Sequence, residues 1–283
     1  MHLFKTRIPD NITNWWQHMI FDWSDNKNKG LWFGMVPMMV LGAITILLFV
    51  AGVIPIVYLW VSFFMWIMIS GLGVAVGYHR VFSHRTHQLP TWKENIILWL
   101  GALSAQGSAL FWVAVHRGYH HPYTDTDRDI HSPVAYGKWH AFIGWINPDT
   151  FAKVNLKYSV DLLKKSNFTW FHKYNYEVMW GTPLVIAVFD WQLAMAACFL
   201  PGLIGLLQDN LVNVVGHTKL VIGYRNFETK DHSQNNILWG YFGWGQGWHN
   251  NHHHSPGSYD FGKGVSGKWW EWDPCNIFKP FLK

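Results

Sequence analysis

The stretch from Gly30 to Tyr78 contains no Asp, Glu, Lys or Arg in 49 consecutive residues. A helix crosses a bilayer in about 20 residues, so this stretch is too long for one crossing and suits two. Gly52 and the helix-breaking Pro55 lie near its middle. The sequence therefore predicts a transmembrane hairpin with spans at about 31–52 and 55–78.

A second apolar stretch, residues 174–216, has no Lys or Arg and is divided by Asp190. It predicts another hairpin, with spans at about 175–189 and 192–213. Residues 95–115 are also uncharged, but a crossing there would separate the histidine clusters described below. We therefore expect 95–115 to lie in the interface or half-buried, as a wall of an apolar tunnel. Only 14% of the chain is charged, against about 25% in a typical soluble domain.

The basic residues occur only before position 30, between 79 and 173, and from 217 onward. Two hairpins place these segments on one side of the membrane, which the positive-inside rule makes cytoplasmic. We therefore expect an all-α membrane protein with four transmembrane helices in two hairpins. One domain, 1–283, would carry a cytoplasmic helical cap from 1–30, 79–173 and 217–283. The net charge of +5 then belongs to the cytoplasmic ends of the spans, and nucleic-acid binding is not expected.

Histidines gather in three short clusters at the ends of these spans. The clusters are His79 with His84, His116 with His120 and His121, and His249 with His252 and His253. The last three are spaced i, i+3 and i+4, so on a helix they would leave one face. Residues five apart lie about 140° apart on a continuous α-helix, so we expect the helix to end between His79 and His84.

Eight imidazoles at the rims of apolar spans would carry a large burial cost if they bound nothing. Imidazole suits iron, zinc, copper and nickel, but eight or nine exceed the four-coordinate shell of one zinc, which indicates two metals. Zinc would hydrolyse, whereas iron or copper would activate O2. Apolar chains offer many C–H bonds and few hydrolysable ones, so the pattern favours an iron enzyme that oxidises lipid. The alternative is a non-catalytic metal-binding or transport protein, although the chain lacks the inverted repeats of many transporters.

The loop after the second cluster holds three acids, Asp125, Asp127 and Asp129. They either form a solvated turn or accept hydrogen bonds from the ring N–H groups that metal-ligating histidines leave free. The isolated histidines are expected to be ordinary polar residues; they are His2, His18, His140, His172 and His232.

The three clusters resemble the histidine boxes of the membrane fatty acyl desaturase family. The pair His79 and His84 is similar to the first box, HxxxxH, and the second cluster is similar to HxxxHH. The third reads GWHNNHH from Gly247 to His253, the form of the delta-9 branch. Asn213 and His217 match the family's NxxxH at the end of the fourth span. The likeness extends over about residues 30–275.

The resemblance implies a di-iron centre with nine histidine ligands: His79, His84, His116, His120, His121, His217, His249, His252 and His253. Asn213 would act on this centre through water or by orienting it, and no further catalytic side chain is implied. Such enzymes use O2 and two electrons to introduce a cis double bond into an acyl chain. The electrons come from a separate ferredoxin-like or cytochrome b5-like carrier.

The expected reaction is delta-9 desaturation of an acyl-CoA, with acyl-lipid and acyl-carrier-protein substrates as alternatives. A hydroxylase, acetylenase or conjugase could use the same centre, whereas alkane hydroxylases typically have six spans. Two residues depart from the family pattern. Gln246 stands where the family usually has Glu, and His254 is an additional histidine. No fused cytochrome b5 domain is expected.

Overall fold

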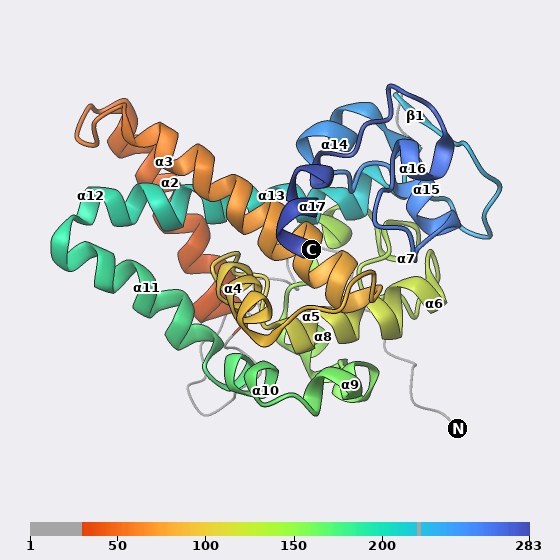
Figure 1. The fold of residues 1–283 in the computed structure, drawn as a ribbon, viewed down its shortest axis with the longest axis horizontal. Coiled ribbons are helices and arrows are strands. Elements are labelled where there is room, and N and C mark those ends of the chain that lie inside the picture. Colours follow the sequence, from red (N-terminus) through yellow and green to blue (C-terminus); the bar gives the residue numbers. More distant parts are fainter. Residues whose placement is uncertain (1–29, 220–221) are drawn as a thin grey trace.

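The computed structural model describes residues 30–219 and 222–283, and these are mostly helical (Figure 1). Residues 1–29, the N-terminal part of the expected cytoplasmic cap, lie outside the described residues. The longest helices extend to one side of the view, at the left of Figure 1, and the short C-terminal helices gather on the other. Helix α15 (His249–His254), which carries the third histidine cluster, lies on the second side.

The first hairpin is present. Helix η2 (Gly30–Met35) continues as α2 (Val36–Val50), and α3 (Tyr58–Trp66) continues as the π-helix η3 (Ile67–Ser83). Gly52 turns the chain between them at a φ of 70°, a conformation that glycine adopts at little cost. The second helix runs to Ser83 instead of ending near 78, so it carries His79 into the interior.

The second hairpin is formed by α11 (Asn175–Phe189) and a helical run of α12 (Trp191–Ala194), η7 (Met195–Phe199) and α13 (Leu200–Val215). Among the described residues, three helical runs are long and apolar enough to cross a membrane: Trp32–Val50, Tyr58–Ser83 and Trp191–Val215. Helix α11 matches the expected third span but has only 15 residues, fewer than the usual 17 to 25 or so.

Residues 95–115 form parts of two short helices, α4 (Thr91–Ala102) and α5 (Ala109–Val115), neither of which is long enough to span. The chain is broken between them by Ala105 and Gly107, both with positive φ. Helix α4 packs closely on η3, since a Cβ at Gly77 would lie 2.0 Å from Cγ2 of Ile97. The segment is therefore largely buried in the protein core, more deeply than the half-buried position expected for it.

Short elements connect the long helices and complete the chain. Between α5 and α11 they are η4 (His116–His120), α6 (His121–Tyr123), α7 (Pro133–Tyr136), η5 (His140–Gly144), α8 (Pro148–Lys153), η6 (Leu156–Ser159), α9 (Val160–Leu163) and α10 (Ser166–Lys173). After α13 they are β1 (Gly223–Tyr224), β2 (Asn235–Asn236), α14 (Ile237–Phe242), α15 (His249–His254), α16 (Lys263–Ser266), η8 (Pro274–Phe278) and α17 (Lys279–Leu282).

The expectation of a purely α-helical chain is wrong in one detail. Strands β1 and β2 pair antiparallel, with Gly223 opposite Asn236. The backbone N–H of Asn236 also donates to the carbonyl of Gly247 at 2.8 Å. These hydrogen bonds satisfy the extended backbone of the loop that leads into the third histidine cluster, and they fix its position.

A buried ion pair joins η3 to the C-terminal segment. Arg80 Nη2 lies 2.9 Å from Asp273 Oδ2, and neither side chain is exposed. Arg80 also donates to the carbonyls of Ala75, Trp244 and Tyr259. Because Arg80 directly follows His79, this pair anchors the first histidine cluster to the C-terminal part of the chain.

Candidate metal centre

The first cluster lies at the end of η3, where the backbone is π-helical. The N–H of His84 donates to the carbonyl of His79 at 3.1 Å, a hydrogen bond between residues five apart. In such a helix residues five apart are about one turn apart, so both imidazoles face the same side. Helix η3 ends at Ser83, with His84 as its C-cap, so the expectation that the helix ends between the two histidines is confirmed. That expectation assumed an α-helix, and the π-helical backbone is a further reason why both rings face one side.

The second cluster repeats this geometry. Helix η4 is also π-helical, and the N–H of His121 donates to the carbonyl of His116. His116 and His121 therefore face one side, where they meet His84. His120 lies between them in the chain and faces another side, where it contacts His217.

The third cluster forms α15, and here the expectation of one shared face is only partly right. His253 Nε2 lies 3.1 Å from His249 Nε2, whereas His252 Nε2 lies 3.1 Å from His79 Nε2. Adjacent residues on an α-helix differ by about 100°. His252 and His253 therefore diverge enough to serve two different groups.

The histidines thus converge on two sites. The five-histidine cluster consists of His79, His84, His116, His121 and His252, and the four-histidine cluster consists of His120, His217, His249 and His253. In each cluster one potential ligand atom per residue lies within 4.8 Å of all the others. Every histidine that the resemblance implies as a ligand belongs to one of these two clusters.

The spacing of the inward-facing nitrogens suits a metal. In the five-histidine cluster, His116 Nε2 lies 2.8 Å from His84 Nε2 and 3.0 Å from His121 Nε2. In the four-histidine cluster, His249 Nε2 lies 2.8 Å from His217 Nε2. Two nitrogens bound at right angles to one metal, each at about 2.1 Å, are about 3.0 Å apart. The donor atoms therefore fit one ion at each cluster.

Burial keeps these rings in the form that binds metal. Burial lowers the pKa of His84 to about 2, and the positive charges of nearby Arg80 and Arg117 act in the same direction. Burial also lowers the pKa of His120 to about 3, even though Asp125 and Asp231 partly oppose it. Metal ions bind the neutral imidazole, so the environment favours binding near neutral pH.

Acidic side chains contact the four-histidine cluster from outside. His120 Nδ1 lies 3.0 Å from Asp129 Oδ2, and His217 Nδ1 lies 3.3 Å from Asp125 Oδ1. Two of the three acids in the loop after the second cluster therefore reach ligand-type histidines. Asp127 does not, and it is exposed.

A further acid was missed from the sequence. Asp231 Oδ2 lies 2.8 Å from His253 Nδ1, and its other oxygen accepts hydrogen bonds from Thr229 and from the N–H of Ser233. The only sequence signal is an acid in the polar loop that precedes the third cluster. Asp129 also lies 3.3 Å from His131 Nδ1, so His131 joins this region as an additional buried histidine.

His217 and Asn213 lie where the NxxxH pattern places them, at and just beyond the end of α13. His217 is buried. Asn213 donates to the carbonyl of Ala141 at 3.2 Å. Its side chain also lines a small cavity of about 60 Å³, whose walls include His79, His116, His120 and His249.

The remaining histidines lie outside both clusters. The ring of His254 is exposed and stacks on Phe227, with 4.0 Å between ring centroids. His87 contacts Thr86 and Tyr259. Polar partners are also present for the three described isolated histidines: His140 contacts the carbonyl of Ile130, His172 the hydroxyl of Ser108, and His232 the carboxylate of Asp125. His2 and His18 lie outside the described residues.

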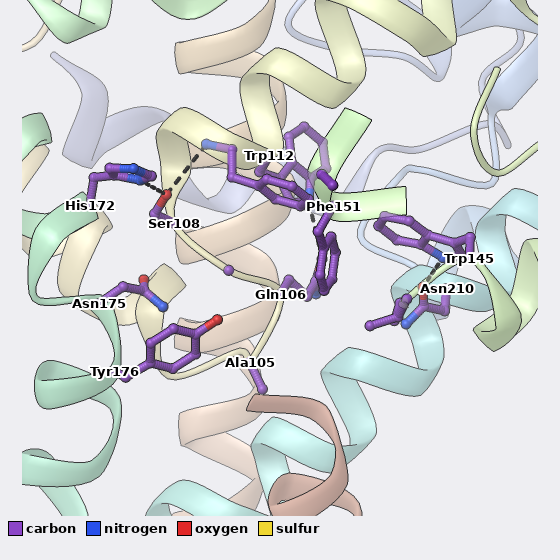
Figure 2. Close-up of a pocket in the computed structure, with 14 residues that line it drawn as sticks. Ala105, Gln106, Ser108, Trp112, Trp145, Phe151, His172, Asn175, Tyr176 and Asn210 are labelled. Carbon is purple, nitrogen blue, oxygen red and sulfur yellow. Dashed lines mark hydrogen bonds between the residues drawn. The ribbon is translucent and has the colours of Figure 1, made fainter. Parts of the chain in front are cut away.

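A larger cavity of about 360 Å³ lies beside the small one (Figure 2). The break between α4 and α5 forms one wall through Ala105, Gln106, Gly107 and Ser108. Figure 2 shows Ser108 and His172 at one end of the cavity, and Trp145 with Asn210 at the other. The two cavities share Gln106, Phe111, Trp112, Trp145 and Asn210. The expected tunnel wall therefore lines a cavity that adjoins the histidine clusters.

A hydrogen-bonded group lies where the two cavities meet, and the sequence did not reveal it. Asp209 Oδ2 accepts from Gln106 Nε2 at 2.6 Å, and Asp209 Oδ1 accepts from Gln246 Nε2 at 2.7 Å. Gln106 in turn accepts from Trp112 Nε1, and Trp112 stacks on His116. Gln246 is thus a donor to a carboxylate, which an ionised Glu at this position could not be.

Comparisons with known proteins agree with this arrangement. Residues 56–259 match the sequence profile of the fatty acid desaturase family. The chain is 32% identical to delta-9 acyl-lipid desaturase 2 of Arabidopsis thaliana over 219 residues, 76% of this chain and 68% of the relative. It is 33% identical to an sn-2 palmitoyl-lipid 9-desaturase of Nostoc sp. (strain 36) over 75% of this chain and 73% of that protein. It is also 29% identical to a hex-5-enoyl-[acyl-carrier protein] acetylenase of Moorena producens (strain JHB) over 74% of this chain and 68% of the relative. The protein is an oxidoreductase that belongs to the fatty acid desaturase family.

Proposed function

We propose that this enzyme introduces a cis double bond, at delta-9, into a fatty acyl chain, using O2 and two electrons. The observation that carries the proposal is the pair of buried histidine clusters, each fitted to one metal ion, beside a largely apolar cavity. We assign one iron to each cluster, with the nine clustered histidines as ligands. When bound, the two irons supply the activation of O2 that C–H oxidation requires.

The protein's own residues would position the acyl chain for this reaction. Phe111, Trp112 and Trp145 line both cavities, so an acyl chain in the larger cavity can extend past them toward the clusters. Their side chains also exclude water from the path, which protects a reactive centre from side reactions. Asn213 lines the small cavity, and we assign it the role of holding a water or orienting the centre.

We further propose a single-domain membrane protein with four spans and both termini on the cytoplasmic side. The two helical turns far from the clusters contact each other, which supports two hairpins side by side. Tyr58 donates to Asp190 at 2.5 Å, and Gln192 donates to the carbonyl of Val53. In α11 the apolar side chains of Leu184, Val185, Val188 and Phe189 are all more than 60% exposed. Lipid would cover such a surface, so we assign α11 as the third span in chain order, a short one.

The molecule that carries the acyl chain can be identified by comparing acyl-CoA and acyl-lipid substrates directly. Acyl-CoA is the substrate expected from the sequence, whereas both desaturases compared above act, by their names, on acyl lipids. The assay must therefore offer both. A ferredoxin-like or cytochrome b5-like protein is the proposed electron donor.

Acetylene formation is the second candidate, because the acetylenase relative covers about the same share of the chain as the desaturases. It would use the same clusters and cavity on a substrate that already carries a double bond. Hydroxylation on the same centre remains a further alternative. Product analysis distinguishes the three reactions. A chain with a triple bond has two hydrogens fewer than one with a double bond, and hydroxylation adds one oxygen.

The proposal is tested by expressing the protein in a host whose fatty acids lack the expected product. Lipids and thioesters are then analysed separately for new double bonds, triple bonds or hydroxyl groups, and purified protein is analysed for metal. We expect about two irons per chain and a product that requires O2 and a reductant. Full activity with zinc alone, or without metal, would refute the proposal.

His217 provides the sharpest variant because it lies outside the three boxes. His217→Ala should lose iron and abolish the product, whereas Asn213→Ala should keep most of its iron and turn over slowly. His87→Ala is the control, since that ring contacts neither cluster. A His217→Ala protein with two irons and near-normal product would remove His217 from the centre.

A further inference from the structure

The two clusters differ in what surrounds them. In eight of the nine rings Nε2 lies against another clustered ring, so Nδ1 faces the surrounding protein. In the four-histidine cluster, three of the four Nδ1 atoms lie within 3.3 Å of a carboxylate: His120 with Asp129, His217 with Asp125, and His253 with Asp231. The fourth, of His249, lies 3.2 Å from the carbonyl of Gln246.

The five-histidine cluster has no such support. The Nδ1 atoms of His79 and His252 are buried and have no hydrogen-bond partner. His217 Nδ1 in the four-histidine cluster also makes no hydrogen bond, but it lies 3.3 Å from the carboxylate of Asp125. Among residues 30–219 and 222–283, no carboxylate forms an ion pair or hydrogen bond with any ring of the five-histidine cluster. Instead, Phe261 packs against His252, with 4.1 Å between ring centroids. The Arg80 guanidinium lies 4.0 Å from the centroid of Phe261 and forms an ion pair with Asp273.

Backbone hydrogen bonds or burial also fix the position of each carboxylate, so its contact with the histidine belongs to the fold. Asp125 also accepts from the backbone N–H of His232 at 2.5 Å, and Asp231 accepts from the N–H of Ser233 at 2.9 Å. Asp129 is almost fully buried between His120 and His131. Three negative groups therefore surround one cluster and none touches the other.

We infer that the two metal positions are electronically unequal, and that Asp125, Asp129 and Asp231 are positioning residues for the iron of the four-histidine cluster alone. A carboxylate that accepts from the outer N–H of an imidazole makes the ring a stronger donor and fixes its orientation. Asp129 and Asp231 accept in this way from His120 and His253, whereas Asp125 acts on His217 through its charge at 3.3 Å. Stronger donors and nearby negative charge stabilise the higher oxidation state of a metal. The iron of the four-histidine cluster is therefore the more easily oxidised of the two. This inference rests on the proposed two-iron function.

With iron in both clusters and O2 as the oxidant, Asp125, Asp129 and Asp231 would offset the positive charge added at the four-histidine position, so oxidation would begin there. These carboxylates would thus set the order in which the two positions lose an electron.

The test uses Asp231→Asn, which keeps an oxygen acceptor for His253 and removes only the charge. Substitution of such an outer partner typically costs 10-fold to 100-fold in metal affinity. At a chelator concentration that leaves the wild-type protein with two irons, we expect Asp231→Asn to lose one iron and to keep the other. In ⁵⁷Fe Mössbauer spectra of the reduced protein, one of two doublets should change. During oxidation, the first iron of the variant should oxidise at a higher potential than in wild type.

Asp129→Asn provides an independent variant on a different ligand and decides the question if Asp231→Asn does not fold. Asp161→Asn is the matched control, because that carboxylate pairs with Arg85 and Arg117 and touches no clustered histidine. Loss of both irons together, equal change in both doublets, or no change in either would overturn the inference. A wild-type protein with no iron would instead refute the proposed function.

Discussion

Replacing Arg80 by Met would leave Asp273 without its cation in a fully buried position. The side chains of both residues have no exposed surface. Breaking a buried ion pair from one side costs about 3–5 kcal/mol, because the remaining charge is buried and unpaired. The guanidinium also lies 4.0 Å from the centroid of Phe261, a cation–π contact of about 0.5–2 kcal/mol. We therefore expect Arg80→Met to destabilise the protein by at least about 4 kcal/mol.

A loss of this size is measurable in detergent. One kcal/mol shifts the melting temperature by about 2–4 °C in domains of 150–250 residues, so a drop of roughly 10 °C or more is expected. The assay is the midpoint of heat-induced loss of the monodisperse peak in size-exclusion chromatography. Because Phe261 also packs against His252, iron content should fall together with the midpoint.

Two further variants make the reasoning refutable. Asp273→Asn in the Arg80→Met background removes the unpaired charge and should recover a large part of the loss. Arg85→Met is the control, since Arg85 pairs with Asp161 at the surface with 67% of its side chain exposed, and such pairs contribute at most about 1 kcal/mol. If the double variant melts no higher than Arg80→Met, or if Arg85→Met costs as much, the ion-pair argument fails.

Three other outcomes follow from the structure. His254→Ala should retain most of its product and iron, whereas His253→Ala should lose both; equal loss would show that the exposed ring of His254 has a role in the centre. Gln246→Glu should lower product sharply, because it places a second carboxyl group about 2.7 Å from Asp209, and Asp209→Asn in the same protein should restore part of it; an unaffected single variant would contradict this. Gly77→Ala should lower the melting midpoint by overpacking worth about 1–3 kcal/mol, and an unchanged midpoint would mean that the helices can separate at no cost.

The residue types and their spacing were sufficient to predict the first hairpin and the identity of the clustered histidines. Uncharged runs long enough to cross a membrane have few alternative folds, because every backbone polar group must be satisfied internally. Eight imidazoles at the ends of such runs are too costly to bury without a ligand. These inferences use only local sequence, and His217 entered through the family pattern.

How the histidines divide between two sites was decided by the tertiary structure. His79 and His252 are 173 residues apart in the chain, so their contact depends on the whole fold. The π-helical backbone of η3 and η4 also changes which residues share a face, and a period of 3.6 read from sequence does not reveal it. Asp231 and Asp209 carry no sequence signature of their own. Long-range packing brings Asp231 to His253. It also brings the side-chain amides of Gln106 and Gln246 to Asp209.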